Sequence, residues 1–426
     1  MDKSFGVNVF GYINGEFGLG EAVRLLIKAL QDANIPVALL NYDVKTNHQN
    51  NDKTFDNFTN DAPYLINLVL VGPSEARKVL THFSNLSAFS DCYNIYYLNW
   101  ESEYFPQEYV LNISYFDEIW VPTLYCKDII SNYVDVPVNI VRYPIEIKLK
   151  NNFNEEAFAF YDNSKFNFLF MFDYNSTFER KNPLNLVKAF GEAFGKEDES
   201  VMLTIKTSSA KRYAAEKKAL SDAISDFKNI KIVEKIFEKE TLHHIIKNCN
   251  SYISLHRSEG FGLTMAEAMY FGKPVIATNY SGNLEFMTKT NSFLVPFEKI
   301  KVDADIINYD KNTIWSNPDI FQAARFMQLV RQNDLEVSIL AKEAQQTILN
   351  DFSISKIGGQ IKLQINFIFD NYKVSKTKNN LISIFIENEL LKNDLHIVNK
   401  SKLIRFILKI KLFFRNRKNK RKKQSK

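Results

Sequence analysis

Short, almost wholly apolar runs alternate with longer stretches in which apolar residues recur at helical spacing, first in one half of the chain and then in the other. The runs have the length of strands and are rich in Val, Ile and aromatic residues. Strands that are apolar throughout are typical of parallel sheets covered by helices on both faces. The predicted strands are 7–13, 37–43, 64–72, 94–100, 118–122 and 138–144 in the first half, and 167–173, 201–206, 230–236, 251–256, 274–280 and 292–297 in the second.

The order of these elements predicts an α/β protein with two doubly wound, Rossmann-like domains. The polar stretch 148–165 separates the two sets of strands, and after Pro296 the chain turns mostly helical. WSNPD at 315–319 is a predicted helix start, and a long helix is predicted from about Ser353 to Tyr372. The predicted parts are a first domain over 1–150, a second over 151–350, a helix over 351–375 that packs back towards the first domain, and a helical basic tail over 376–426.

The composition excludes several classes of protein. The 426-residue chain is 45% apolar and 24% charged, so it is not collagen-like, of low complexity or wholly disordered. Its three cysteines have no close spacing, which excludes a disulfide framework and a Cys-based zinc site and fits a reducing compartment. No signal peptide is recognisable, and no stretch approaches about 18 apolar residues without charges. We therefore expect a cytoplasmic protein without a membrane-spanning helix.

Charge is divided unevenly along the chain. Of the 54 basic residues, 13 lie in residues 400–426, which hold no acidic residue, so the other 41 stand against 49 acidic residues. In this tail, apolar residues at helical spacing such as Leu403 and Phe406 accompany Lys and Arg, and a polybasic run follows from Arg415 to Lys423. The pattern favours a helix at an anionic membrane surface; a solvated tail and a helix covered by a protein partner are the alternatives. Nucleic-acid binding is not expected, because the acidic body has no recognisable nucleic-acid module.

Ligands of open parallel sheets bind beyond the carboxyl ends of the strands, and the first such end carries a glycine-rich loop. Gly15, Gly18 and Gly20 stand between a strand and an amphipathic helix, where glycine lets backbone N–H groups approach an anion. Their spacing is not that of the dinucleotide-binding fingerprint GxGxxG. An anion site and a tight strand-to-helix turn are equally favoured by this loop.

Three cations follow strands of the second half. Arg180 and Lys181 precede a helix that is predicted to begin at Asn182 and Pro183, and Lys206 ends the next strand. Solvated loop side chains are the ordinary alternative. Because the carboxyl ends of adjacent parallel strands meet at one edge, the three cations together favour a clamp for a diphosphate.

Two carboxylates lie close together in the segment 254–287. A strand ends at His256, Glu259 lies in the following loop, and Glu267 lies in a helix from about Leu263 that is apolar on all sides. A buried carboxylate needs hydrogen-bond donors, and sugar hydroxyls are suitable ones. One carboxylate can thus reach a ribose and the other a transferred sugar, the alternative being a capping Glu and a surface Glu. His256 either contacts the sugar or simply ends the strand.

The motifs resemble a known family when they are taken together. EGFGLTMAE at 259–267 with the following GKPVIAT, NGEFGLGEA at 14–22, ERKNP at 179–183 and WSNPD at 315–319 are similar in order and spacing to retaining glycosyltransferases of the GT-B fold, specifically glycosyltransferase family 4 (glycosyl transferases group 1). The resemblance extends from about residue 5 to about residue 370. It implies two Rossmann-like domains that face a cleft.

The resemblance also implies an activity: a sugar moves from a nucleotide-sugar held mainly by the second domain to an acceptor held by the first. By the family's pattern Glu267 binds the ribose, and the catalytic residue Glu259 binds hydroxyls of the donor sugar. Arg180 and Lys181, also catalytic, stabilise the departing diphosphate with Lys206. The predicted donor-binding residues further include Gly18, Gly20, His256, Gly260, Phe261, Gly262 and Leu263.

One departure from the family's pattern leaves a detail open. Phe172-Asp173 stands at a strand end where the family often has Gly-Arg. Which basic residue meets each phosphate is therefore not assigned.

No metal or other cofactor is expected. The DxD sequence Asp303-Ala304-Asp305 follows the last strand, and His243-His244 are adjacent rather than four residues apart. Trp100 and Glu101 follow a first-half strand, so they are predicted to face the cleft and bind the acceptor, with packing as the alternative for the Trp.

The predicted function is that of a cytoplasmic, metal-independent, retaining glycosyltransferase, peripheral at the inner face of the cell membrane. Its acceptor is a glycan or a lipid-linked glycan in the synthesis of a cell-surface polysaccharide such as lipopolysaccharide, capsule or exopolysaccharide. Another GT-B enzyme (a sugar-nucleotide epimerase or a phosphorylase) and a non-catalytic, membrane-anchored protein that binds a glycan or nucleotide-sugar are the alternatives.

Overall fold

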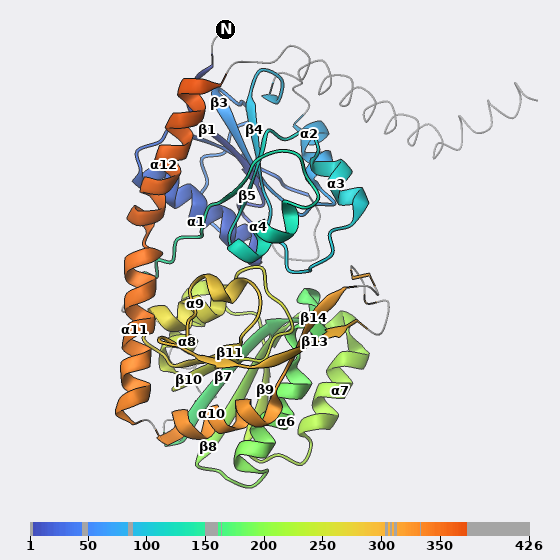
Figure 1. Ribbon diagram of the computed structural model, residues 1–426, viewed down its shortest axis with the longest axis vertical. Helices are drawn as coiled ribbons and strands as arrows, with labels where there is room; N and C mark the ends of the chain where they lie inside the picture. Colours follow the sequence, from blue (N-terminus) through green and yellow to red (C-terminus); the bar gives the residue numbers. More distant parts are fainter. Residues whose placement is uncertain are drawn as a thin grey trace, which may run out of the picture.

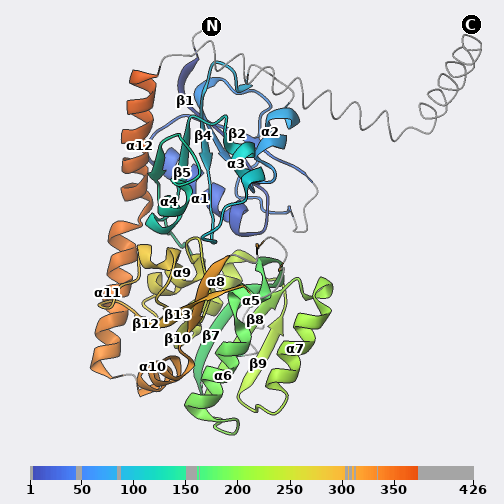
Figure 2. The same ribbon diagram turned by 45° about the vertical axis from the view of Figure 1, so that its right-hand side comes forward.

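The computed structural model describes residues 3–44, 50–83, 88–149, 161–162, 164–302, 306, 309–310, 313–332 and 334–372. The basic tail predicted over 376–426 lies outside the described residues, and so does the Asp303–Asp305 sequence. The described chain forms two α/β bodies, one above the other in Figure 1 and again in the turned view of Figure 2.

Each body is built on a six-stranded sheet, and its strands are the predicted ones. The order β2-β1-β3-β4-β5-β6 forms the first sheet, and the order β12-β11-β10-β7-β8-β9 forms the second. Neighbouring strands are parallel throughout, which confirms the prediction of two doubly wound domains. The strands are β1 Ser4–Gly11, β2 Val37–Asn41, β3 Tyr64–Leu70, β4 Tyr93–Tyr97, β5 Glu118–Val121 and β6 Val138–Ile140, then β7 Phe166–Asp173, β8 Val201–Ser208, β9 Ile230–Glu234, β10 Ser251–Ser254, β11 Val275–Thr278 and β12 Phe293–Val295.

A row of buried amides crosses the first sheet. Asn8, Asn67 and Asn94 occupy paired positions on β1, β3 and β4. Asn8 donates to Asn67 at 2.8 Å, Asn67 donates to Asn94 at 2.7 Å, and all three are at most 2% exposed. Since a buried amide must find its partners, this row fixes the register of the three strands against a one-residue slip.

Helices cover both faces of each sheet. In the first domain α1 and α12 pack on one face and α2, α3 and α4 on the other; in the second, α8, α9 and α11 lie opposite α6, α7 and α10. Their bounds are α1 Gly18–Asp32, α2 Ala76–His82, α3 Gln107–Ile113, α4 Leu124–Ile130, α5 Phe178–Lys181, α6 Pro183–Phe194, α7 Ala214–Ile224, α8 Lys239–Asn248, α9 Leu263–Tyr270, α10 Ile320–Gln332, α11 Leu335–Asp351 and α12 Ile354–Asn371.

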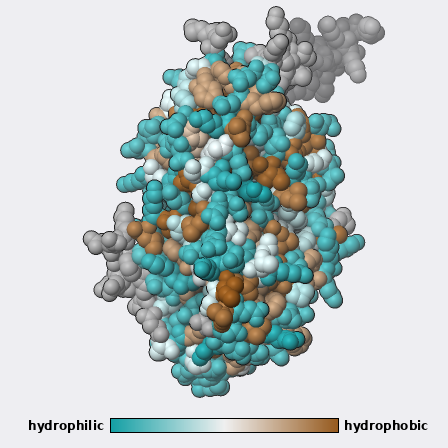
Figure 3. Space-filling view, turned by 60° about the vertical axis from the view of Figure 1, so that its left-hand side comes forward, coloured by the Kyte–Doolittle hydropathy of each residue, from teal (hydrophilic) through white to brown (hydrophobic). Residues whose placement is uncertain are grey.

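The last helix returns to the first domain, along the left edge of Figure 1. The chain crosses back at Phe352, whose carbonyl accepts a hydrogen bond from the Ile145 N–H at 2.7 Å. Helix α12 then lies so close to α1 that a Cβ on Gly358 would stand 2.6 Å from the Ala29 carbonyl oxygen. The outer surface of this side is mainly hydrophilic with separate hydrophobic patches (Figure 3), and Leu363 and Phe367 are exposed on α12.

The structure corrects the predicted helix start at WSNPD. Residues Trp315–Pro318 belong to β14 (Ile314–Pro318), which pairs antiparallel with β13 (Phe297–Lys301). The following helix, α10, begins only after Asp319, whose carboxylate accepts the backbone N–H of Gln322 at 3.0 Å. The capping signal was therefore real, but it belongs to Asp319 alone, and the residues before it pair with a strand that the sequence pattern did not reveal.

Candidate functional site

A cavity of about 800 Å³ lies between the two domains. Its walls come from the β1–α1 loop of the first domain and from segments that follow β7, β8 and β10 in the second. Strand order reverses beside β1 in the first sheet and between β7 and β10 in the second, and such switch points open a crevice at the carboxyl ends of the strands. Of the predicted site residues, those lining the cavity are Gly18, Arg180, Lys181, Lys206, Glu259, Phe261, Gly262, Leu263 and Glu267.

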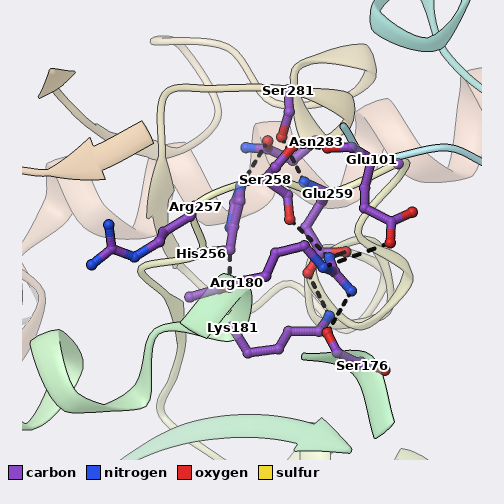
Figure 4. A network of polar contacts seen from close by, with 12 residues as sticks. Glu101, Ser176, Arg180, Lys181, His256, Arg257, Ser258, Glu259, Ser281 and Asn283 are labelled. Carbon is purple, nitrogen blue, oxygen red and sulfur yellow. Dashed lines mark hydrogen bonds and ion pairs between the residues drawn. The ribbon is translucent and has the colours of Figure 1, made fainter. Parts of the chain in front are cut away.

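The centre of the site is an ion cluster of two cations and one carboxylate (Figure 4). Lys181 and Arg180, at the end of α5, both reach Glu259: the lysine Nζ contacts Oε1, and the arginine Nη1 lies 3.3 Å from Oε2. Arg180 also donates to the carbonyls of Ser258 at 2.8 Å and Ser176 at 2.9 Å. The loop that follows β7 and the loop that follows β10 are thus joined through these charges.

The electrostatics of this cluster keep Glu259 ionised. Burial by itself would raise the pKa of Glu259, but the ammonium of Lys181 and the guanidinium of Arg180 outweigh that effect and lower the pKa to about 2. Burial lowers the pKa of Lys181, and the charge of Glu259 opposes the change. At neutral pH Glu259 is therefore a hydrogen-bond acceptor, not a proton donor.

Lys206 is a buried cation at the end of β8. Lys206 is 7% exposed and lines the cavity. Among the described residues, its ammonium has no hydrogen-bond or ion-pair partner. Burial lowers its pKa to about 8, and the charge of Asp173 only partly compensates. A cation that is desolvated without a partner is costly, so the site is suited to an anionic ligand that supplies the missing charge.

Two helix N-termini open onto the cavity. Helix α1 begins at Gly18 and α9 begins at Leu263, and neither N-cap residue, Phe17 or Gly262, caps its helix with a side chain. Gly262 has a φ of 95°, a conformation that favours glycine. The free N–H groups of the first turns carry partial positive charge, which favours bound anions.

The two predicted loop glycines differ in role. A Cβ on Gly18 would meet no atom within 4 Å, so its backbone is open to a ligand. A Cβ on Gly20 would stand 2.1 Å from the Gly15 carbonyl oxygen, so Gly20 permits a tight turn and does not line the cavity. Gly20 therefore agrees with the tight-turn interpretation, and anion binding at Gly18 stays a prediction.

Sequence reasoning missed further cavity residues, among them Arg24, His243 and Asn99. Arg24 donates to the carbonyls of Ile13 and Gly15, both at 2.8 Å, and thereby holds the glycine loop. His243 on α8 lies 3.3 Å from the carboxylate of Glu267, whose side chain is 12% exposed. Asn99 lies one residue before the predicted Trp100, and its buried Oδ1 has no donor among the described residues.

Five predicted site residues do not line the cavity: Gly20, Trp100, Glu101, His256 and Gly260. His256 is fully buried, and its ring nitrogens are within 3.2 Å of Ser254, Tyr280 and Asn283, so it joins β10 to the next loop. The Gly260 carbonyl accepts a hydrogen bond from Thr123 of the first domain at 3.1 Å.

The predicted acceptor residues contact protein groups. Trp100 is 8% exposed, packs edge-on against Phe105 and donates its indole N–H to Tyr104, which agrees with the packing alternative. The carboxylate of Glu101 faces Arg180 and Tyr309. Acceptor binding by either residue stays a prediction.

The described residues were also compared with the side-chain groups that bind metal ions. They contain no group of three or more His, Cys, Asp or Glu side chains able to hold a metal ion. In the same part of the chain, no helix is long and apolar enough to cross a membrane.

The two domains and their arrangement define the fold class of the protein. Two parallel six-stranded domains that face a shared cavity form the GT-B fold. Residues 156–309, which make up most of the second domain, match the family described as Glycosyl transferases group 1. No curated protein matches the chain in sequence.

Solved structures share this fold at low sequence identity. Sucrose-phosphate synthase from Thermosynechococcus elongatus has a TM-score of 0.63 and 14% identity over 86% of this chain and 100% of its own. HepE from Anabaena, solved with UDP and glucose, has a TM-score of 0.60 and 12% identity over 85% and 100%. TarM from S. aureus, solved with UDP and other ligands, has a TM-score of 0.52 and 16% identity over 72% of this chain and only 56% of its own. At these identities the likeness establishes the fold alone.

Proposed function

We propose that the protein is a glycosyltransferase that moves a sugar from a nucleotide-sugar to a hydroxyl of an acceptor. One observation carries the proposal. At the carboxyl ends of both sheets, one cavity is surrounded by cations, two uncapped helix N-termini and the carboxylates Glu259 and Glu267. The cations are the Arg180–Lys181 pair and Lys206, which has no hydrogen-bond or ion-pair partner among the described residues. Such a site offers positive charge to a diphosphate and hydrogen-bond acceptors to sugar hydroxyls.

The proposed chemistry follows from where charge develops. Breaking the bond between the anomeric carbon and the phosphate leaves negative charge on the diphosphate and positive charge on the sugar. Arg180, Lys181 and Lys206 stabilise the leaving group, because fixed cations in a partly dry cavity act more strongly than in water. Ionised Glu259 accepts hydrogen bonds from the donor sugar, and Glu267, beside His243, accepts them from the ribose.

We further propose that the reaction proceeds with retention of configuration and without a metal ion, as in glycosyltransferase family 4. The cations and helix N-termini supply the charge that a metal would otherwise supply. HepE and TarM were each solved with UDP, so a uridine nucleotide is the first donor class to test. The proposed acceptor is a glycan or lipid-linked glycan of a cell-surface polysaccharide, reached from the inner face of the membrane.

Ligand-detected magnetic resonance with a panel of nucleotide-sugars tests the donor site. At least one nucleotide-sugar should bind, and Glu267→Ala should weaken its binding by about 10- to 100-fold, since a hydrogen bond to a charged group contributes roughly 1.5–3 kcal/mol. The matched control is Glu240→Ala on the same helix as His243, outside the cavity lining. Failure of every nucleotide-sugar to bind would contradict the proposal.

The metal-free mechanism has its own test. Transfer activity should persist in excess chelator. If chelation abolished activity and magnesium or manganese restored it, the cations described above would not be sufficient. Product anomers identified by magnetic resonance would decide between retention and inversion.

A further inference from the structure

The loop after β4 carries a carboxylate into the ion cluster from the other domain. Glu101 belongs to the first domain, yet its Oε1 accepts the hydroxyl of Tyr309 at 2.8 Å and lies 3.8 Å from Nε of Arg180. Its side chain is 27% exposed and does not line the cavity. In Figure 4 the Glu101 carboxylate points towards the guanidinium of Arg180.

The backbone of Glu101 is fastened to the same loop of the second domain. The Ser258 hydroxyl donates to the Glu101 carbonyl, and the Tyr125 hydroxyl lies 3.4 Å from that carbonyl and 3.3 Å from the Ser258 hydroxyl. The Ser258 carbonyl in turn accepts from Arg180. Glu101 and Arg180 therefore both hold Ser258, the first through its hydroxyl and the second through its carbonyl.

The guanidinium of Arg180 has one edge that its own domain leaves open. Nη1 and Nη2 are bound by Ser258, Glu259 and Ser176, all of the second domain. Nε is buried, and within the described residues no acceptor lies at hydrogen-bonding distance. Glu101, at 3.8 Å, is the carboxylate that faces it. Orientation of this edge therefore depends on the first domain.

We propose that Glu101 is a positioning residue through which the first domain orients the guanidinium of Arg180, so that domain closure completes the cationic site. This inference rests on the proposed function, in which Arg180 stabilises the departing diphosphate. Without Glu101, Arg180 keeps Glu259 as its only carboxylate partner within the part of the chain that the structure describes, and is drawn towards it. The guanidinium then leaves the position that serves the leaving group, and turnover falls more than donor binding.

The same loop offers a matched control. Glu103 also joins the two domains, because its Oε1 accepts the Tyr280 hydroxyl at 2.6 Å and the Lys299 ammonium at 2.7 Å. No contact between Glu103 and Arg180 is present among the described residues. Glu103→Gln thus weakens an interdomain contact without removing the charge that faces Arg180.

The first experiment compares kcat and donor KM of Glu101→Gln, Tyr309→Phe and Glu103→Gln with the wild-type protein. Glu101→Gln should lower kcat by roughly 10- to 100-fold while donor KM stays within about threefold, since small misplacements of a catalytic group act on the transition state. Tyr309→Phe should have a smaller effect in the same direction, and Glu103→Gln should stay within about twofold. Equal kcat in wild type and Glu101→Gln would overturn the inference, and so would equal losses in Glu101→Gln and Glu103→Gln.

The second experiment needs no substrate, so it separates this inference from the proposed function. The Nε–H resonance of Arg180, assigned by its loss in Arg180→Lys, should exchange slowly with water in the wild type and in Glu103→Gln. In Glu101→Gln the exchange should be faster by about tenfold or more, because the group that confines this edge is lost. An unchanged exchange rate would overturn the inference even if the protein transfers sugar. An inactive wild type with the expected exchange pattern would overturn the proposed function alone.

Discussion

Some residues of the site could be predicted from their place in the sequence, and others could not. Glu259, Arg180 and Lys181 were found because each lies between a predicted strand of one sheet and the helix that follows it, so their convergence is a consequence of parallel topology. The pair His243 and Glu267 was not found. The two residues are 24 positions apart in the sequence and lie on separate helices. No local sequence pattern predicts which faces of two helices will be in contact.

Lys206 provides the first prediction, because it is a charged group that destabilises the unliganded protein. Lys206→Met should raise the free energy of unfolding at pH 7 by roughly 1–3 kcal/mol and weaken UDP binding by about tenfold. Denaturant unfolding and calorimetric titration with UDP measure the two effects. A variant that is both less stable and equally able to bind UDP would contradict this account of Lys206.

The lowered pKa of Lys206 also implies that its effect on stability depends on pH. In the folded chain Lys206 loses its proton near pH 8, whereas in the unfolded chain it keeps the proton until about pH 10.5. At this residue the unfolded state therefore binds more protons between these values, so the contribution of Lys206 to the stability of the wild type rises with pH there. The stability gap between wild type and Lys206→Met should close over that interval. Lys188→Met, on the exposed face of α6, should show no such change.

At the scale of elements, the twelve sheet strands could be predicted and the β13–β14 hairpin could not. Strands that are buried on both faces are almost wholly apolar, so they can be recognised in the sequence as short apolar runs. The hairpin is different, because Glu298, Lys299 and Lys301 of β13 are exposed and charged. Its partner strand runs directly into the Asp319 cap of α10, so the helix signal concealed the strand.

The contact between α1 and α12 gives a prediction with a built-in control. Gly358→Ala places a methyl group 2.6 Å from the Ala29 carbonyl, so α12 must move away, and stability should fall by about 1–3 kcal/mol. At Gly359 a Cβ meets no atom within 4 Å, so Gly359→Ala should stabilise the helix by about 0.5–1 kcal/mol. Thermal unfolding measures the stability of the two variants. If Gly358→Ala were more stable than the wild type, α1 and α12 would not be in close contact.

The amide row of the first sheet gives another prediction at this scale. Asn67→Ala removes the central member, so Asn94 loses its donor and Ala88 loses the N–H that its carbonyl accepts. The free energy of unfolding should fall by roughly 2–3 kcal/mol, because buried polar groups are left without partners. Asn132→Ala, at an exposed helix end, should change it by less than about 0.5 kcal/mol. Urea titrations followed by circular dichroism compare the two.

For the whole molecule, the sequence predicts a membrane-surface role for residues 400–426, outside the described residues. A variant ending at Asn399 should lose co-sedimentation with anionic vesicles at low salt while keeping transfer to a soluble acceptor, since each nearby cation contributes about 1 kcal/mol on anionic lipid. High salt should weaken the binding of the full-length chain. Equal pelleting of both proteins would exclude this role for the tail.

The two chain crossings between the domains have a mechanical consequence. Ile145 and Phe352, which lie near the two places where the chain passes between the domains, are joined by a hydrogen bond, so the two chain connections lie side by side. Two domains that are joined by adjacent chain connections can rotate relative to each other about these connections, which act as a hinge. Donor and acceptor would then approach along one fixed arc, and a single opening angle, measurable by solution scattering, would describe the state of the whole molecule.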